Sequence, residues 1–300
     1  MIKSTDVEMR DVIPENCDDS RVDCVVRFHD CRRLPELERC IFSLVGQRYR
    51  PITIHLMLQC FSDAQHREVA DRLGLLLRLP DAPVLRIHNW QGEHGIDWRT
   101  RLFNLALGVV RGRYLAFLDY DDVLFPEAYE LLVRQMRYSG AGIVFASVQE
   151  MRVNIRGSLY QVAGTQKPNY HGESLFDLFR SNFCPIHSYM IDRRGVPGEI
   201  MHFDESLSIE EDYDLLLRIC AACRSDFSLL DTKVGYYFFK TDGSNTVAQQ
   251  TGLTGTRLLQ FEMAQLRIKE RKLTTIIAPE VCADLGLTAD RPVVIKDLAQ

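Results

Sequence analysis

Three carboxylates follow one short apolar run in this 300-residue chain. The stretch FLDYDDVLF, residues 117–125, places Asp119, Asp121 and Asp122 within four positions. Acidic side chains repel one another and are costly to bury without partners. An Asp-x-Asp pair at a strand end offers the hard oxygen ligands that Mg²⁺ or Mn²⁺ prefers, and the cation would offset the repulsion. The alternative is helix capping near Pro126, which accounts for only one of the three aspartates.

A second acidic cluster begins the segment EEDYDLLLRICAAC, residues 210–223, whose apolar residues have helical spacing. A carboxylate such as Asp212 could take a proton from a hydroxyl group during catalysis. Acidic residues are also favourable at any helix N-terminus, so the residues alone leave both interpretations open. Arg218 follows Asp214 by four positions, a spacing that predicts an ion pair along the helix.

Short apolar runs alternate with helical patterns through the first half of the chain. Strands are predicted at 23–28, 52–58, 83–88 and 114–118, with helices at 34–47, 63–79 and 98–111 between them. This alternation predicts an α/β fold with a central, mostly parallel sheet flanked by helices. Ligands of such sheets bind outside the carboxyl ends of the strands, where the three aspartates lie. A plain dinucleotide-binding fold is not favoured, because the turn after the first strand contains no glycine.

The second half is less regular. Its predicted elements are a helix at 126–140, a strand at 143–149, a helix at 210–223, a strand at 234–239, a turn at 241–245 and a helix over about 254–272. Residues 150–200 are expected to form loops around a cleft. The predicted division is an N-terminal extension (1–21), two halves (22–125 and 126–250) and a C-terminal helix and tail (251–300), which could lead to a further domain.

The bulk composition excludes several classes of protein. A formal net charge of −5 does not favour general nucleic-acid binding, which needs a strongly basic face. The polar N-terminus has no signal-peptide core, and no apolar run approaches the roughly 20 residues that span a bilayer. Nine scattered cysteines fit reduced thiols better than a disulfide framework. A cytoplasmic protein is therefore expected.

Three ordered blocks of the sequence resemble family 2 glycosyltransferases. The segment 101–132 resembles their central block, with an Asn-bearing helix, a Gly-Arg-Tyr turn, the strand, Asp-x-Asp-Asp and a helix that starts at a proline. The segment 203–218 resembles their second block, Phe-Asp-Glu followed by Glu-Asp and a helix with a trailing arginine. The opening block is matched through residue 58, including the spacing of Ser43, Gln47 and Tyr49. The resemblance covers about residues 22–246. It implies that 22–125 is a nucleotide-sugar-binding half and that 126–250 is an acceptor-binding and catalytic-base half.

This resemblance implies a Rossmann-like nucleotide-diphosphate-sugar transferase fold, known as GT-A, and a divalent cation, Mn²⁺ or Mg²⁺. By position, Asp121 would be the main metal ligand and Asp119 would face the ribose or the metal. Asp122 would support Asp121. Asp212 would be the catalytic base, with Glu211 as its supporting or acceptor-side neighbour, and the reaction would invert the sugar configuration.

Further donor contacts follow from the same resemblance. Asn104 matches the Asn-bearing helix, and Arg101 lies three residues earlier, whereas the family often has arginine directly before that asparagine. Lys240 lies near a basic or histidine position that closes over the phosphates. Gln59 replaces an acidic contact to uracil, which leaves uridine, thymidine and guanosine donors open, and Asp30 is a second nucleotide candidate. For Arg101 and Lys240, a solvated surface charge is the alternative.

The predicted activity is transfer of a sugar from a nucleotide-diphosphate donor to a hydroxyl of a growing glycan or lipid-linked glycan, such as O-antigen or capsule. His187 is a further candidate contact to the metal or the acceptor. The protein would be cytoplasmic or peripheral on the cytoplasmic face of the inner membrane, with other polysaccharide-assembly proteins as partners. Two alternatives stay open: a haloacid dehalogenase-like phosphatase with Asp119 as nucleophile, and a catalytically inactive nucleotide- or glycan-binding module. The phosphatase family usually has glycine where Asp122 stands.

Overall fold

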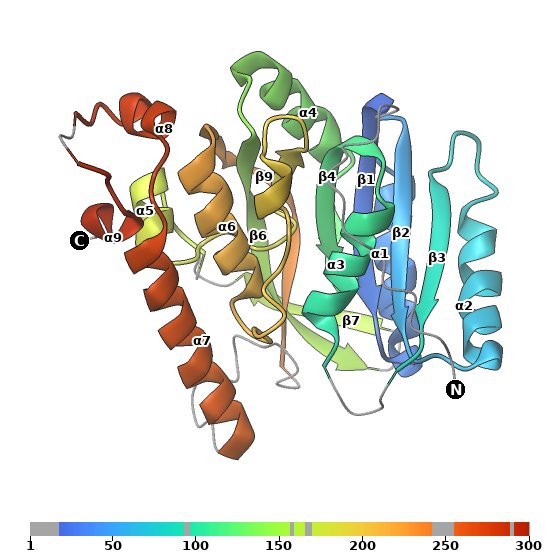
Figure 1. The fold of residues 1–300 in the computed structure, drawn as a ribbon. Coiled ribbons are helices and arrows are strands. Elements are labelled where there is room, and N and C mark those ends of the chain that lie inside the picture. The colour runs from blue at the N-terminus through green and yellow to red at the C-terminus, as the bar shows by residue number, and fades with distance from the viewer. Residues whose placement is uncertain are drawn as a thin grey trace, which may run out of the picture.

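A computed structural model describes residues 18–92, 97–156, 159–165, 170–241, 255–288 and 291–299. Most of the predicted N-terminal extension, and most of the turn predicted at 241–245, lie outside these residues. The described strands form one nine-stranded sheet in the order β3-β2-β1-β4-β8-β6-β9-β5, with β7 beside β6 (Figure 1). The strands are β1 (Asp18–Phe28), β2 (Ile52–Gln59), β3 (Val84–Trp90), β4 (Gly112–Asp119), β5 (Val123–Leu124), β6 (Ile143–Arg156), β7 (Leu159–Thr165), β8 (Tyr189–Asp192) and β9 (Ser225–Lys240).

Helices cover both faces of this sheet. They are α1 (Leu34–Val45), α2 (Asp63–Leu76), α3 (Arg99–Val109), α4 (Ala128–Ser139), α5 (Leu175–Arg180), α6 (Glu211–Ala222), α7 (Gly255–Thr274), α8 (Pro279–Asp284) and α9 (Ile295–Leu298). Two short 3₁₀ turns lie at Cys31–Arg33 and Gly198–Ile200.

The first four strands form a parallel half of the sheet. β1 pairs in parallel with β2 and with β4, and β2 pairs in parallel with β3. β8 then runs antiparallel between β4 and β6, and β9 returns parallel to β6. The predicted α/β class with helices on both faces is confirmed. The sheet continues without interruption across the boundary predicted at residues 125 and 126, so the division into two functional halves stays a prediction.

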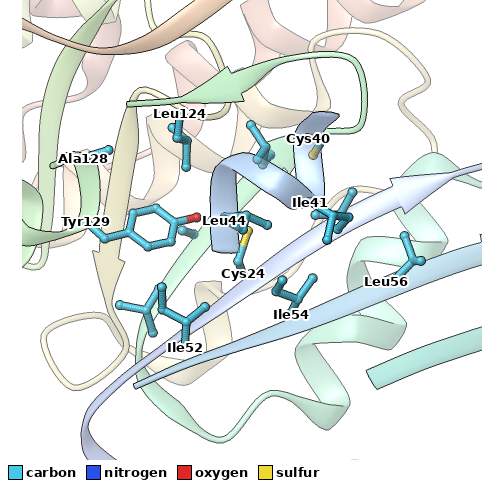
Figure 2. Close-up of a cluster of buried hydrophobic side chains, with 14 of the residues drawn as sticks. Cys24, Cys40, Ile41, Leu44, Ile52, Ile54, Leu56, Leu124, Ala128 and Tyr129 are labelled. Carbon is cyan, nitrogen blue, oxygen red and sulfur yellow. The ribbon is translucent and has the colours of Figure 1, made fainter. Parts of the chain in front are cut away.

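The hydrophobic core is divided by the sheet into two clusters. Alternate residues of β1, β2 and β4 point to one face and pack against α1, α2 and α4. Figure 2 shows part of this cluster, where Cys24, Ile54 and Leu56 of the strands meet Ile41 and Leu44 of α1. The other face packs against α3, α5 and α6. Burial of both faces explains why these strands read as continuous apolar runs.

The expectation of loops over residues 150–200 is wrong. β6 extends to Arg156, and the segment also contains β7, α5 and β8. The sequence MRVNIR at the end of β6 alternates apolar and polar residues, which suits a strand with one exposed face. β7 pairs antiparallel with this part of β6. β8 has only four residues, all buried, so its sequence alone carries little periodicity.

The C-terminal segment packs against the second face of the sheet. α7 starts away from the body and runs back toward α6 (Figure 1). Ile268, Ile277, Val281 and Ile295 of this segment are buried in the cluster that also contains α6. Within the described part of the chain, no helix has the length and apolar character needed to cross a bilayer.

Candidate active site

The three aspartates end β4 and turn the chain toward β5. The backbone N–H of Asp122 donates to the carbonyl of Asp119 (3.1 Å), which closes the turn. Asp119 is more than one-third exposed, and its Oδ1 lies 3.3 Å from Nη2 of Arg27 in β1. Arg27 is held in place because its guanidinium lies over the ring of Phe103, 4.2 Å from the centroid. Asp119 thus faces a partly open site beside a cation.

Asp121 is paired with the last residue of β9. The ammonium of Lys240 donates to Oδ2 of Asp121 and lies 3.2 Å from Oε2 of Glu36 in α1. The side chain of Asp121 is partly exposed, whereas those of Lys240 and Glu36 are buried. Asp121 therefore already accepts a cation in this structure. Its exposed side stays open to solvent.

Asp122 is buried, whereas Asp119 and Asp121 are partly exposed. Its Oδ1 accepts a hydrogen bond from the backbone N–H of Phe238 in β9 (2.9 Å). Burial, followed by the charges of Asp121 and Asp119, raises the pKa of Asp122 well above its usual range. The alternative that this residue caps the next helix is not realised, because Glu127 is the N-cap of α4. Asp122 instead connects the turn formed by residues 119–122 to β9 through its hydrogen bond with Phe238.

His187 lies next to Asp122 and Tyr237. Nδ1 of this buried ring is 3.5 Å from Oδ2 of Asp122, and the ring stacks on Tyr237 with an interplanar angle of 3°. Burial lowers the pKa of His187 to about 4, so the ring is neutral at physiological pH. This buried position favours support of the site over direct contact with an acceptor.

Asp212 is the second residue of α6 and is half-buried. Its Oδ1 accepts from the backbone N–H of Tyr213 (2.8 Å). Burial, followed by the charges of Glu211 and Glu210, raises the pKa of Asp212 to about 8, and the charge of Asp119 contributes in the same direction. The influence of Asp119 indicates that the end of β4 and the start of α6 face one site. A carboxylate with this pKa is suited to accept a proton near neutral pH.

Glu211 and Arg99 link α6 to α3. Nη1 of Arg99 lies 3.6 Å from Oε1 of Glu211, and Nε of Arg99 lies 2.9 Å from Oδ2 of Asp97. Burial lowers the pKa of Arg99, but the carboxylates of Glu211, Asp97 and Asp119 outweigh this effect and raise it. Arg99 therefore stays a cation between the two acidic clusters.

A buried charge network fixes the orientation of α6. Arg218 pairs with Asp214 along the helix, as the sequence predicted, with Nη2 2.9 Å from Oδ2. Arg218 also donates to the carbonyl oxygens of Ile200 and His202. Nε of Arg271 in α7 donates to Oδ1 of Asp214 (2.7 Å). The helix that carries Asp212 is thus held by groups from two other segments, the stretch that contains Ile200 and His202 and helix α7.

The side-chain amide of Asn104 is hydrogen-bonded to Phe203 and Glu205. Its amide accepts from the backbone N–H of Phe203 (2.7 Å) and donates to the carbonyl of the same residue (3.0 Å). Its Nδ2 also lies 3.1 Å from Oε1 of Glu205. The amide therefore joins α3 to the segment that leads into α6. A donor contact for Asn104 stays a prediction.

The other predicted donor residues lie on both sides of this site. Arg101 is exposed, with its guanidinium 4.7 Å from the centroid of Trp98. Asp30 lies two residues after the end of β1 and accepts from the guanidinium of Arg32 (2.8 Å). Gln59 ends β2 opposite Trp90, at the same carboxyl edge as Asp119. The structure brings Asp30, Gln59 and Asp119 to one edge and places Arg101 on the surface.

Sequence reasoning missed three residues of the site: Arg27, Arg99 and Glu36. A signal existed for Arg27, because a charged residue inside the apolar strand DCVVRF needs a partner. Only Arg101 is predicted from the sequence, although Arg99 also lies in the first turn of α3. Glu36 in the first turn of α1 looked like an ordinary acidic helix start.

Comparison with known sequences identifies the family. A family model described as Glycosyl transferase family 2 matches residues 24–196. The chain is 28% identical over 213 residues to the succinoglycan biosynthesis protein ExoO of Rhizobium meliloti (strain 1021), a match that covers 69% of this chain and 57% of that protein. It is 24% identical over 181 residues to the uncharacterized protein y4gI of Sinorhizobium fredii (strain NBRC 101917 / NGR234), covering 59% of this chain and 19% of that one. The matches span less than two thirds of either relative.

Solved structures show the same fold. S. aureus TarS 1-349 in complex with UDP-GlcNAc superposes with a TM-score of 0.62 at 12% identity, covering 89% of this chain and 71% of that chain. The mannosyltransferase PcManGT from Pyrobaculum calidifontis, in complex with GDP-Man and Mn²⁺, gives 0.57 at 13% identity, covering 92% and 70%. The phosphatase alternative is therefore not retained. Because the family match extends over more than half of the chain, the protein belongs to glycosyl transferase family 2.

Proposed function

We propose that this chain is a metal-dependent, inverting glycosyltransferase that moves a sugar from a nucleotide-diphosphate donor to a hydroxyl of a growing glycan. The observation that carries the proposal is the pairing of two acidic groups across one site. Asp119 ends β4 and Asp121 follows it, and Asp212, whose pKa is raised to about 8, is the second residue of α6. The charge of Asp119 contributes to that raised pKa.

The carboxylates of Asp121 and Asp119 fit a divalent cation. Asp121 already holds the ammonium of Lys240, so its environment favours positive charge. Among the residues that the structure describes, no three His, Cys, Asp or Glu side chains converge as a closed metal site. Mg²⁺ and Mn²⁺ sites of this open kind take one or two carboxylates and complete their shell with substrate phosphates and water. A bound cation would stabilise the charge that develops on the leaving diphosphate.

Asp212 is proposed as the catalytic base. A carboxylate that takes the acceptor proton must lie on the face of the sugar opposite the leaving group, and direct displacement then inverts the anomeric configuration. Glu211 keeps the pKa of Asp212 high through its charge, and Arg99 fixes Glu211. The network around Asp214 holds α6, so Asp212 is presented from a rigid helix.

The donor and acceptor classes follow from the relatives by analogy. Fold relatives bind UDP-GlcNAc or GDP-Man, and a sequence relative takes part in succinoglycan biosynthesis. We extend this to a nucleotide-diphosphate sugar whose base contacts Gln59 and Asp30, and to an acceptor on a bacterial surface polysaccharide. Transfer would occur in the cytoplasm or at the cytoplasmic face of the inner membrane, alongside other polysaccharide-assembly proteins.

The proposal is tested with a donor screen. Purified protein is incubated with Mn²⁺ and with uridine, thymidine and guanosine diphosphate sugars, and thermal shift and nucleotide release are scored. At least one donor should stabilise the protein and release its nucleotide. Asp212→Asn should lose nucleotide release while keeping the thermal shift, whereas the exposed control Asp231→Asn should keep both. Absence of stabilisation by every nucleotide in the presence of Mn²⁺ would refute the proposed function.

A further inference from the structure

Lys240 is a buried cation that contacts two carboxylates at once. It is the last residue of β9, and its side chain is only 1% exposed. The ammonium donates to Oδ2 of Asp121 and lies 3.2 Å from Oε2 of Glu36. It also lies 5.9 Å from the centroid of the Tyr120 ring.

The two carboxylates differ in how they can respond to another cation. Glu36 is buried, and its Oε1 is fixed by Nε of Arg33 at 2.8 Å. The side chain of Asp121 is 22% exposed to solvent. A buried ammonium is costly to leave without a carboxylate partner. A cation that approaches from solvent therefore meets Asp121 first, and Lys240 keeps Glu36 as a partner.

We propose that Lys240 is the resident counter-ion of Asp121 and competes with the divalent cation for that carboxylate, with Glu36 as the alternative partner of the ammonium. This inference rests on the proposed function, since it concerns the cation that Asp121 would hold. Lys240 is then a positioning residue that sets how tightly the free protein binds metal. Two cations cannot share one carboxylate at short range without repulsion.

The competition explains why two acidic residues so far apart in sequence converge on one lysine. If Lys240 served only to neutralise Asp121, Glu36 would not be needed at the same ammonium. The second carboxylate, already 3.2 Å from the ammonium, keeps Lys240 paired when the other cation occupies Asp121. Metal binding then exchanges one ion pair for another, and no buried charge is left alone.

The test measures Mn²⁺ binding to the donor-free protein by calorimetry and by the paramagnetic resonance signal of free Mn²⁺. Lys240→Met should tighten binding by about tenfold, because the competing charge is gone. The matched control is Lys233→Met, on the same strand, whose ammonium donates to Ser147 (2.7 Å) and touches neither acid. It should leave the affinity unchanged. Glu36→Gln should weaken binding, because the ammonium then loses the carboxylate of Glu36 and is held more strongly by Asp121.

Each outcome decides the inference. Unchanged or weakened Mn²⁺ binding by Lys240→Met, or equal tightening by the Lys233→Met control, overturns it. Should Lys240→Met fail to give a cooperative thermal unfolding transition, Glu36→Gln carries the test, and tighter or unchanged binding by that variant overturns the inference. If the wild-type protein binds Mn²⁺ with UDP but Lys240→Met does not change the affinity, only the inference falls. If no form binds Mn²⁺ with or without nucleotide, the metal-dependent function falls with it.

Discussion

The pH dependence of transfer should report the carboxyl group of Asp212, and Glu211→Gln should move it. The pKa of Asp212 is raised from 3.8 to about 8, first by burial and then by the charges of Glu211 and Glu210. A base must be deprotonated to act, so kcat/KM should rise with pH and level off above about 8. At pH 7 only about a tenth of the free enzyme would carry the active carboxylate, and at pH 6 about a hundredth.

Glu211→Gln removes the largest charge that acts on Asp212. The substitution also removes the carboxylate that pairs with Arg99 at 3.6 Å. The positive charge of Arg99 then lowers the pKa of Asp212 as well. Removal of one neighbouring charge at this range lowers a pKa by roughly one unit, equivalent to ~1.4 kcal/mol. The acidic limb of kcat/KM should therefore shift toward lower pH by about one unit. The substitution can also change the plateau value of kcat/KM. The two proteins are therefore compared by the pH at which kcat/KM rises.

The assay follows nucleotide release at subsaturating donor, with Mn²⁺ held constant, between pH 5.5 and 9.5 in overlapping buffers, a range that reaches about 2.5 units below and about 1.5 units above the pKa of Asp212. Asp231→Asn removes one negative charge from an exposed position in β9 and should leave the limb unmoved. A wild-type profile that is flat between about pH 6 and 8 would show that Asp212 is not the titrating base. A limb that stays in place or moves to higher pH in Glu211→Gln would refute the assigned cause.

Three further outcomes follow from the same site. Arg218→Met leaves buried Asp214 with one cation instead of two and should lower the free energy of unfolding in urea by about 3 kcal/mol. Asn104→Ala leaves the backbone polar groups of Phe203 without their amide partner, so unfolding in urea should show a loss of about 2 kcal/mol. Removal of divalent cations with a chelator should abolish nucleotide release, and added Mn²⁺ or Mg²⁺ should restore it.

The parallel half of the fold could be predicted from sequence because its signals are local. Each apolar run is long enough to read as a strand, and each helix between them has apolar residues at helical spacing. Observed β2, α2 and β4 begin or end within a few residues of the predicted bounds. The position of the aspartates at a strand end followed from these bounds alone.

The second half was not predictable in the same way, because its strands depend on distant partners. β8 is a four-residue strand that is stable only between β4 and β6. β9 runs over 16 residues, of which only the last third is an apolar run. A short or partly polar strand gains its stability from neighbours on both sides, so its own residues carry a weak signal.

The choice of arginine shows a limit of helical spacing. Arg99 and Arg101 are both on α3, and residues two apart point to different sides of a helix. The spacing to Asn104 favoured Arg101 as the residue that faces the site. The structure places Arg101 over Trp98 and Arg99 against Glu211. Sequence placed both on the correct helix, but only tertiary packing decides which side of that helix faces α6.

The three aspartates acquire separate properties from partners that lie outside their own segment. Arg27 is the register partner of Asp119 between β1 and β4, and β9 supplies both the ammonium of Lys240 and the N–H of Phe238. A slip of β4 by one residue would turn the side chain of Asp119 to the opposite face and separate it from Arg27. The charge distribution at this site is thus set by the register of β4 and by the long path of β9. The motif supplies the carboxylates, and the sheet determines which one stays exposed, which one exchanges cations and which one is buried.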